Sequence, residues 1–248
     1  MTPEFLAVLV AGAAAGGLVN GLAGFGMALF ALVFWLQIMP PVQAVAVAVV
    51  MSVVNGVQGL WLVRRQISDN RRRLARFVLP ALAGIPLGVA ALTVLDARAL
   101  KLLIAAFLVL YGGFFSLRRS LPRITRPTPL IDGAVGFLGG VIGGATSLSG
   151  ALPTMWCAMR DWPKGETRAV LQPFNVVVLG LTAVLVALGG AYDRRTLIYI
   201  AVSVPVTLAS AQFGIHAFKR LNDDQFRRLL IAMMFVSGLA LLAREAVA

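Results

Sequence analysis

Long runs without a charged residue divide this chain into apolar segments. The longest run covers residues 5–63, and further runs cover residues 77–95, 133–159, 169–192 and 196–218. A helix of about 20 apolar residues crosses a hydrocarbon layer roughly 30 Å thick. A membrane β-barrel would instead show strands of about 10 residues with alternating hydrophobicity, a pattern that these runs lack. The hydrophobic pattern therefore predicts an all-α polytopic membrane protein.

Two of the apolar segments do not fit a single transmembrane helix. Six stretches have a suitable length, and they cover residues 42–63, 77–95, 102–117, 169–192, 196–218 and 229–243. Residues 5–39 and 133–159 are longer, and small residues interrupt both. As one continuous helix, residues 5–39 would measure roughly 52 Å at about 1.5 Å per residue. Each segment therefore either crosses once as a tilted, broken helix or turns back as a re-entrant hairpin.

The two interrupted segments repeat one another at an offset of 123 residues. The glycine-rich stretch 16–26 corresponds loosely to 139–149. At this offset identical residue types fall at Gly16, Gly17, Gly21, Ala28, Leu29, Pro40, Ala46 and Val47. Pro80 and Pro205 also correspond, at a slightly larger offset. Interrupted hydrophobic segments in matching positions of two halves are typical of a transporter's substrate site.

The distribution of Lys and Arg favours the re-entrant arrangement. If both interrupted segments cross once, 13 basic residues lie on one side of the membrane and 9 on the other; if both are re-entrant, the division is 17 to 5. The positive-inside rule prefers the second division. Each half then holds a re-entrant, glycine-rich hairpin and three transmembrane helices. Because each half crosses the membrane three times, the second half is inverted relative to the first. We therefore expect a single membrane domain, 1–248, built from two inverted repeats. The first repeat covers residues 4–117, a basic linker covers 118–129, and the second repeat covers 130–246.

Composition supports this assignment, since 59% of the residues are hydrophobic and 13% are charged, against about 25% charged in soluble domains. The net charge of +12 comes from basic residues beside apolar runs. Membrane topology explains them, so we expect a lipid bilayer and no nucleic acid as partner. The first run lacks a positive n-region, which argues against a signal peptide. The single Cys157 belongs to no metal or redox motif. We expect no metal, no cofactor and a multi-pass location in the cytoplasmic (inner) membrane.

The interruptions would end half-helices near the middle of the membrane. Irregular backbone at that depth occurs only inside protein or beside a watery cavity, and glycine permits the sharp turns. The N-terminus of a half-helix presents free N–H groups and partial positive charge, which suit an anion. We therefore expect a substrate site formed by Asn20, Gly24, Phe25, Gly26, Thr146, Ser147, Ser149, Asn55, Arg168, Gln172 and Asn175.

A simpler interpretation is that these residues only hold helices together. Small residues let helix backbones approach closely, and buried amides act as interhelical glue. The patterns that fit this interpretation are Gly17-xxx-Gly21 and Gly140-xxx-Gly144. Against it, Arg168, Gln172 and Asn175 follow i, i+4, i+7 spacing and share one helix face, where Pro173 would introduce a kink. The duplicated location of the breaks favours a site.

The acidic residues bear on the charge of the substrate. All ten flank apolar runs, and none lies in the middle of a span. Proton pumps commonly bury a carboxylate in the membrane, so this pattern argues against a carboxylate relay and against a cationic substrate. Neutral donors, helix ends and basic loops fit a small anion instead. His216, the only histidine, lies near a span end and is interpreted as an interfacial residue.

The duplicated glycine-rich break, the number of spans and the length resemble the TauE/SafE sulfite exporter family over nearly the whole chain. Its members carry a motif of the form G-hydrophobic-G-G early in each half. Here the motif reads Gly24-Phe25-Gly26-Met27 and Ser147-Leu148-Ser149-Gly150. Serines replace the usual glycines in the second copy, and their hydroxyls would change how an anion is coordinated. The resemblance implies a membrane transporter of sulfite, a sulfonate or a related sulfur-containing anion.

Three other functions are compatible with parts of the sequence. An anion channel would conduct far faster than a transporter turns over. An intramembrane serine protease would need Ser149 as nucleophile and His216 as base, but the usual G-x-S-G lacks its leading glycine here. We therefore predict no enzymatic activity. A purely structural subunit is the third alternative. The sequence leaves open the direction of transport, the coupling ion and whether the protein forms a homo-oligomer.

Overall fold

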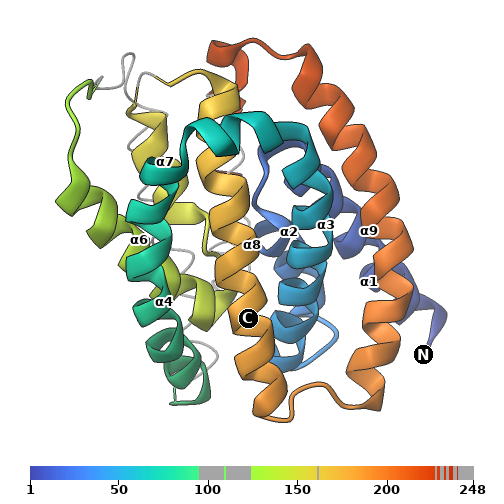
Figure 1. The fold of residues 1–248 in the computed structure, drawn as a ribbon. Helices are drawn as coiled ribbons and strands as arrows, with labels where there is room; N and C mark the ends of the chain where they lie inside the picture. The colour runs from blue at the N-terminus through green and yellow to red at the C-terminus, as the bar shows by residue number, and fades with distance from the viewer. Residues whose placement is uncertain are drawn as a thin grey trace.

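The computed structural model describes residues 1–94, 109, 124–160, 162–226, 228–229, 232, 235–236 and 239. Within these residues the chain is helical, and the one β-bridge joins Ile124 to Arg160. Figure 1 shows how the helices are arranged as a bundle. In chain order they are α1 (Pro3–Ala23), α2 (Met27–Trp35), α3 (Pro41–Asp69), α4 (Arg71–Val94), α6 (Pro129–Thr146), α7 (Ala151–Ala158), α8 (Lys164–Leu188) and α9 (Arg194–Arg220).

Six of these helices are long and apolar enough to cross a membrane, namely α1, α3, α4, α6, α8 and α9. The helical, membrane-spanning class predicted from the hydrophobic pattern is therefore confirmed. Two predicted spans, residues 102–117 and 229–243, lie largely outside the described residues. The division into two repeats joined by the linker 118–129 stays a prediction.

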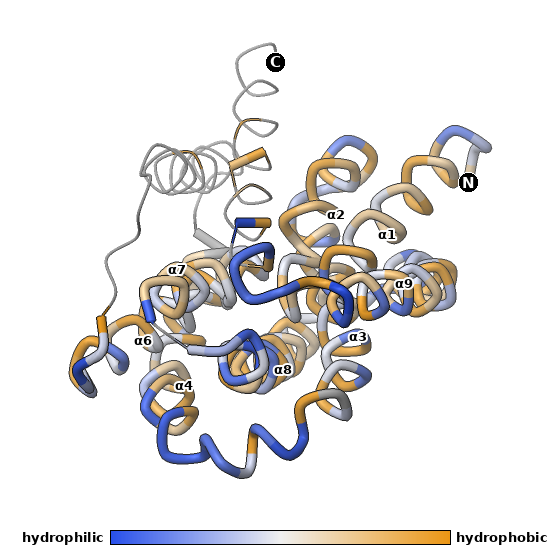
Figure 2. The backbone as a smooth tube through the Cα atoms, turned by 90° about the horizontal axis from the view of Figure 1, so that it is seen from above, coloured by the Kyte–Doolittle hydropathy of each residue, from blue (hydrophilic) through white to orange (hydrophobic). Residues whose placement is uncertain are grey.

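Several helices extend beyond the charge-free runs. α3 continues to Asp69 through a kink at Val63 (φ −117°, ψ 16°), and Asn70 alone separates it from α4. Apart from Asn70, the basic stretch 64–76 is therefore helical, and Figure 2 shows it as hydrophilic. α8 begins at Lys164 rather than residue 169. Arg, Lys, Gln and Ala favour helix, so a helix continues where the apolar run stops. α8 also continues through Pro173 as one helix.

The two interrupted segments each form a pair of antiparallel helices, in which a short helix, α2 or α7, follows a longer one, α1 or α6, that is long enough to cross a membrane. In the first pair, the indole Nε1 of Trp35, at the end of α2, donates to the carbonyl oxygen of Leu9 in α1 at 3.0 Å. In the second pair, Nε1 of Trp156 in α7 donates to Oδ1 of Asp132 at the start of α6 at 2.6 Å. The backbone N–H of Ile124 also donates to the carbonyl of Met159 at 2.9 Å. In each pair the second helix thus runs back toward the beginning of the first.

Glycines bring helices from the two halves of the chain into backbone contact. α1 packs along α9, α6 packs along α4, and α3 packs along α8. A Cβ at Gly21 would lie 2.1 Å from the carbonyl oxygen of Ala211, and one at Gly140 would lie 2.4 Å from that of Ala81. The Gly-xxx-Gly patterns therefore do serve close helix packing. The same contacts fix the breaks that follow these glycines in the centre of the bundle.

Candidate anion site at the two helix breaks

The first break lies between α1 and α2 and depends on two glycines in the left-handed region. Gly24 has φ 83° and Gly26 has φ 95°. The N–H of Gly24 donates to the carbonyl oxygen of Asn20 at 2.8 Å, which ends α1. Side chains with a Cβ rarely adopt this backbone conformation. The sequence therefore ends one helix and begins the next within three residues.

The second break lies between α6 and α7 and uses serine where the first uses glycine. Ser147 has φ 62°, and its N–H donates to the carbonyl of Gly143 at 2.9 Å. Local hydroxyl bonds support this conformation. Oγ1 of Thr146 donates to the carbonyl of Ile142 at 2.7 Å and accepts from the N–H of Leu148 at 3.2 Å. Both hydrogen bonds of the Thr146 hydroxyl thus lie within the break and stabilise its conformation.

The two breaks meet at Asn175 on α8. Its Nδ2 donates to the carbonyl oxygen of Gly24 at 3.3 Å, and its Oδ1 accepts from the hydroxyl of Ser149. A Cβ at Gly150 would lie 2.7 Å from Cβ of Phe25. Residues from three distant parts of the chain therefore form one cluster, as the repeated pattern predicts for a shared site.

A small enclosed cavity lies between the breaks. Its lining includes Phe25 and Gly26 from the first break, Ser147 and Gly150 from the second, and Asn175. About 10 Å³ is available to the centre of a water molecule, which is close to the minimum for a single water. The Ser147 hydroxyl donates to the carbonyl of Val45 at 3.3 Å, so it also closes this space. This conformation holds the two breaks tightly together.

Arg168 is the one charged member of the predicted set, and it is fully buried. Its Nη1 donates to the carbonyl of Leu22 at 3.0 Å and its Nη2 to that of Gly21 at 2.8 Å. Its guanidinium carbon lies 4.4 Å from the centre of the Phe218 ring. Nε makes no hydrogen bond, and no carboxylate in the described part of the chain forms an ion pair with this side chain. A cation thus sits at the carbonyl end of α1, where the helix dipole favours positive charge.

Three buried amides near the first break keep unused polar atoms. Nε2 of Gln172 donates to the carbonyl of Gly56 at 3.1 Å, while its Oε1 has no partner. Nδ2 of Asn20 and Oδ1 of Asn55 have none among the described residues. The Nδ2 of Asn55 lies 3.9 Å from Sδ of Met27. Buried polar atoms are usually satisfied, so this set is typical of a site that binds a polar ligand.

Comparison with known proteins identifies the family. The model of the "Sulfite exporter TauE/SafE" family matches residues 8–241. This chain belongs to the TauE/SafE family. A search of the curated proteins found no match. The match extends over both breaks and confirms the resemblance seen in the sequence. The protein is therefore a multi-pass membrane protein of a family of membrane transporters.

Sequence reasoning missed two residues of this TauE/SafE protein's candidate site. Phe218 stacks on Arg168 from the end of α9, and no sequence signal marks a contact between residues 50 positions apart. Ser52 lines the cavity and lies three positions before Asn55, so helical spacing would have found it. His216 is exposed on α9, whereas Ser149 is buried and bonded to Asn175. These two residues are not paired.

Proposed function

We propose that this protein transports a small sulfur-containing anion, such as sulfite or a sulfonate, across the cytoplasmic membrane through a site between the two helix breaks. The observation that carries the proposal is the complete burial of Arg168 beside the first break. Membership of the TauE/SafE family supports the chemical class of the substrate.

A buried guanidinium in a membrane protein calls for compensation. Charged side chains inside transmembrane segments are costly and are usually paired with other groups. Two carbonyl oxygens and the Phe218 ring supply part of the compensation, and Nε of Arg168 keeps one donor unused. A bound anion accepting from Nε supplies the missing charge and a strong, charge-assisted hydrogen bond.

The helix starts at the breaks add neutral donors. α2 begins after Gly26 and α7 begins after Gly150, and neither N-cap makes a side-chain hydrogen bond. The first N–H groups of a helix have no partner inside the helix, and they favour anions. Nδ2 of Asn20 is a further buried, unused donor. The unused oxygens of Asn55 and Gln172 suit an anion that carries its own proton, such as hydrogen sulfite.

An inverted repeat explains how such a site is reached from both sides. The antiparallel pairs α1–α2 and α6–α7, and the reciprocal packing of α1 on α9 and α6 on α4, support two hairpins that enter from opposite faces. The cavity between them has room for about one water molecule. In the proposed cycle the hairpins separate on one side at a time, and the anion replaces the contact between Ser149 and Asn175.

Flux in proteoliposomes tests the proposal. The purified protein is reconstituted, and uptake of sulfite, thiosulfate, sulfoacetate, taurine and sulfate is compared with and without a pH gradient. We expect saturable flux of at least one sulfur-containing anion and none of zwitterionic taurine. Arg168→Gln should remove the flux, whereas Lys219→Gln, at an exposed position near the end of α9, should retain it. Flux of none of the anions would refute the proposal, and single-channel conductance would assign a channel.

A further inference from the structure

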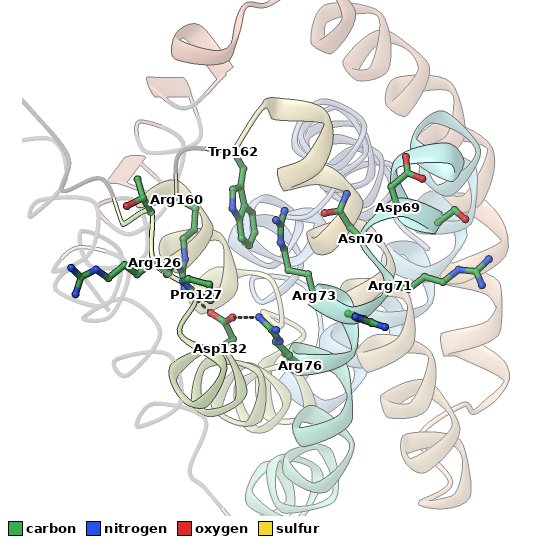
Figure 3. Close-up of a pocket in the computed structure, with 13 residues that line it drawn as sticks. Asp69, Asn70, Arg71, Arg73, Arg76, Arg126, Pro127, Asp132, Arg160 and Trp162 are labelled. Atoms are coloured by element: carbon green, nitrogen blue, oxygen red, sulfur yellow. Dashed lines mark hydrogen bonds and ion pairs between the residues drawn. The ribbon is translucent and has the colours of Figure 1, made fainter.

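A second cavity lies at the end of the bundle where α3 passes into α4 and α6 begins (Figure 3). Its volume is about 660 Å³, within the range of ligand-binding pockets. Six arginines line it, against the two carboxylates of Asp69 and Asp132. It lies at the first turn of α6, and the break lies at the other end of that helix. This pocket is therefore distinct from the site between the breaks.

A network of arginines fixes one wall of the pocket. Asp132 is buried and pairs with Arg160 at 2.9 Å. Arg73 pairs with Glu166 at 2.7 Å, and its guanidinium carbon lies 4.1 Å from the centre of the Trp162 ring. In Figure 3 the Arg73 side chain lies beside Trp162. The ring stack and the ion pair hold the Arg73 guanidinium in a fixed orientation, which reduces the entropy lost when it binds an oxyanion.

Arg72 and Arg76, also at the pocket, have no close carboxylate partner among the described residues. Arg76 is 41% exposed, and its nearest carboxylate oxygen, on Asp132, is 3.9 Å away. Asp132 is already engaged by Arg160, so this second contact is weak. Arg72 is exposed and makes no ion pair with the described residues. Arg71 and Arg126 extend away from the pocket centre along the surface (Figure 3), where they add to the positive field.

The surroundings of the pocket are apolar and exposed. Leu79 lies three residues after Arg76 on α4 and is 66% exposed, and Leu130, at the start of α6, is 88% exposed. Residues three apart on a helix are neighbours. Exposed leucines therefore lie near residues of the basic pocket on α4 and α6, two helices that can span the membrane. This arrangement suits a ligand with an anionic head and a hydrocarbon body.

We propose that this pocket binds a phosphate group, and that an anionic phospholipid of the adjoining leaflet carries it. Arg72, Arg73 and Arg76 hold the phosphate oxygens, since guanidinium groups bind phosphate in a bidentate geometry. The acyl chains lie along the exposed leucines. Basic pockets between transmembrane helices on the cytoplasmic side are suited to anionic headgroups. This inference is independent of what the protein transports.

The test is a titration of the purified protein in neutral detergent, read by the shift in its unfolding temperature. One arm adds phosphatidylglycerol, a second adds phosphatidylcholine, and a third adds free pyrophosphate. Wild type should bind phosphatidylglycerol saturably and phosphatidylcholine far more weakly. Arg72→Gln/Arg76→Gln should weaken this binding roughly 25-fold. Each arginine near an anionic lipid surface contributes about 1 kcal/mol, and about 1.4 kcal/mol corresponds to a tenfold change in affinity.

Two control variants keep the outcome decisive. Arg72→Lys/Arg76→Lys keeps the charge and should retain part of the affinity. Arg194→Gln/Arg195→Gln removes two arginines from the start of α9, past the other end of α8, and should leave binding unchanged. Equal phosphatidylglycerol affinity in wild type and Arg72→Gln/Arg76→Gln would overturn the proposal. Pyrophosphate binding as tight as lipid binding would overturn the assignment to a lipid.

Discussion

Nη2 of Arg168 lies 2.8 Å from the carbonyl oxygen of Gly21, which joins α8 to the last turn of α1 across 147 residues of sequence. The contact places a cation beside a helix break instead of beside a carboxylate. Because α8 also carries Asn175, which bonds to both breaks, one helix holds the two broken segments together. Movement of α8 relative to either break would change the site.

The Ser149 hydroxyl is expected to contribute to anion binding. A hydrogen bond to a charged partner contributes about 1.5–3 kcal/mol, so Ser149→Ala should weaken apparent affinity roughly 10- to 150-fold. Ser149→Asp should be worse, since it places a negative charge where the anion binds. Thr182→Val, on α8 and bonded only to the carbonyl of Val178 among the described residues, is the matched control. Transport by Ser149→Asp equal to wild type, measured as concentration-dependent flux, would locate the site elsewhere.

Glycines at the first break and at the α6–α4 contact should not tolerate larger side chains. Gly24 has φ 83°, and its Cβ would lie 2.6 Å from Oε1 of Gln172. A Cβ at Gly144 would lie 2.6 Å from the carbonyl oxygen of Ile85. Gly24→Val and Gly144→Val should therefore abolish flux while much of the protein still inserts. Gly180→Ala has open space around it and should transport normally. Normal flux in either valine variant would exclude a tight functional break at that position.

Cysteine labelling can determine which side of the membrane each loop and the N-terminus face. Native Cys157 is buried, so its background labelling should be low. With two re-entrant hairpins, a cysteine at position 2 should label from outside, and one at position 71 should label only after permeabilisation. The residues around Arg123 should share the cytoplasmic side with position 71. Labelling of position 2 only from inside would remove the re-entrant arrangement and the inverted repeat.

Two tryptophans close the hairpins and should differ in their effect on stability. Trp156 donates to the carboxylate of Asp132, whereas Trp35 donates to a neutral carbonyl. Loss of the first bond should cost about 1.5–3 kcal/mol and loss of the second about 0.5–1.5 kcal/mol. Trp156→Phe should therefore lower the free energy of unfolding in detergent more than Trp35→Phe. Trp61→Phe, at a position that is 70% exposed, is the control. An equal decrease in the free energy of unfolding in all three variants would contradict this prediction.

The positions of the breaks could be predicted from sequence because their cause is local. Left-handed backbone at Gly24 and Gly26 needs glycine, and the repeat located the second break although Ser147 replaces a glycine there. In the two closing contacts the acceptors Leu9 and Asp132 lie 123 residues apart, which is the offset of the repeat, and the donors Trp35 and Trp156 lie 121 residues apart. The pattern alone did not show that this offset would extend to the side-chain contacts.

The surroundings of Arg168 could not be predicted, because they depend on tertiary packing. Helical spacing placed Arg168 on one helix face with Gln172 and Asn175, but it did not show what this face contacts. The structure places it inside α8, fully buried, against α1 and Phe218. The ends of α3 and α4 could not be predicted for a related reason: helix propensity carries both helices past the apolar region and through residues 64–76, apart from Asn70. Apolar runs indicate where the membrane lies, and they do not fix where helices end.

Equilibrium binding of radiolabelled sulfite to the purified protein tests the central claim most directly, because it requires neither reconstitution nor a known transport direction. Wild type should bind saturably. Arg168→Gln should bind at least roughly tenfold more weakly, since the charge-assisted bond is lost, and Arg168→Lys should fall between the two. Lys219→Gln should bind as wild type does. Equal sulfite affinity in wild type and Arg168→Gln, with both proteins folded, would contradict an anion site beside the first break.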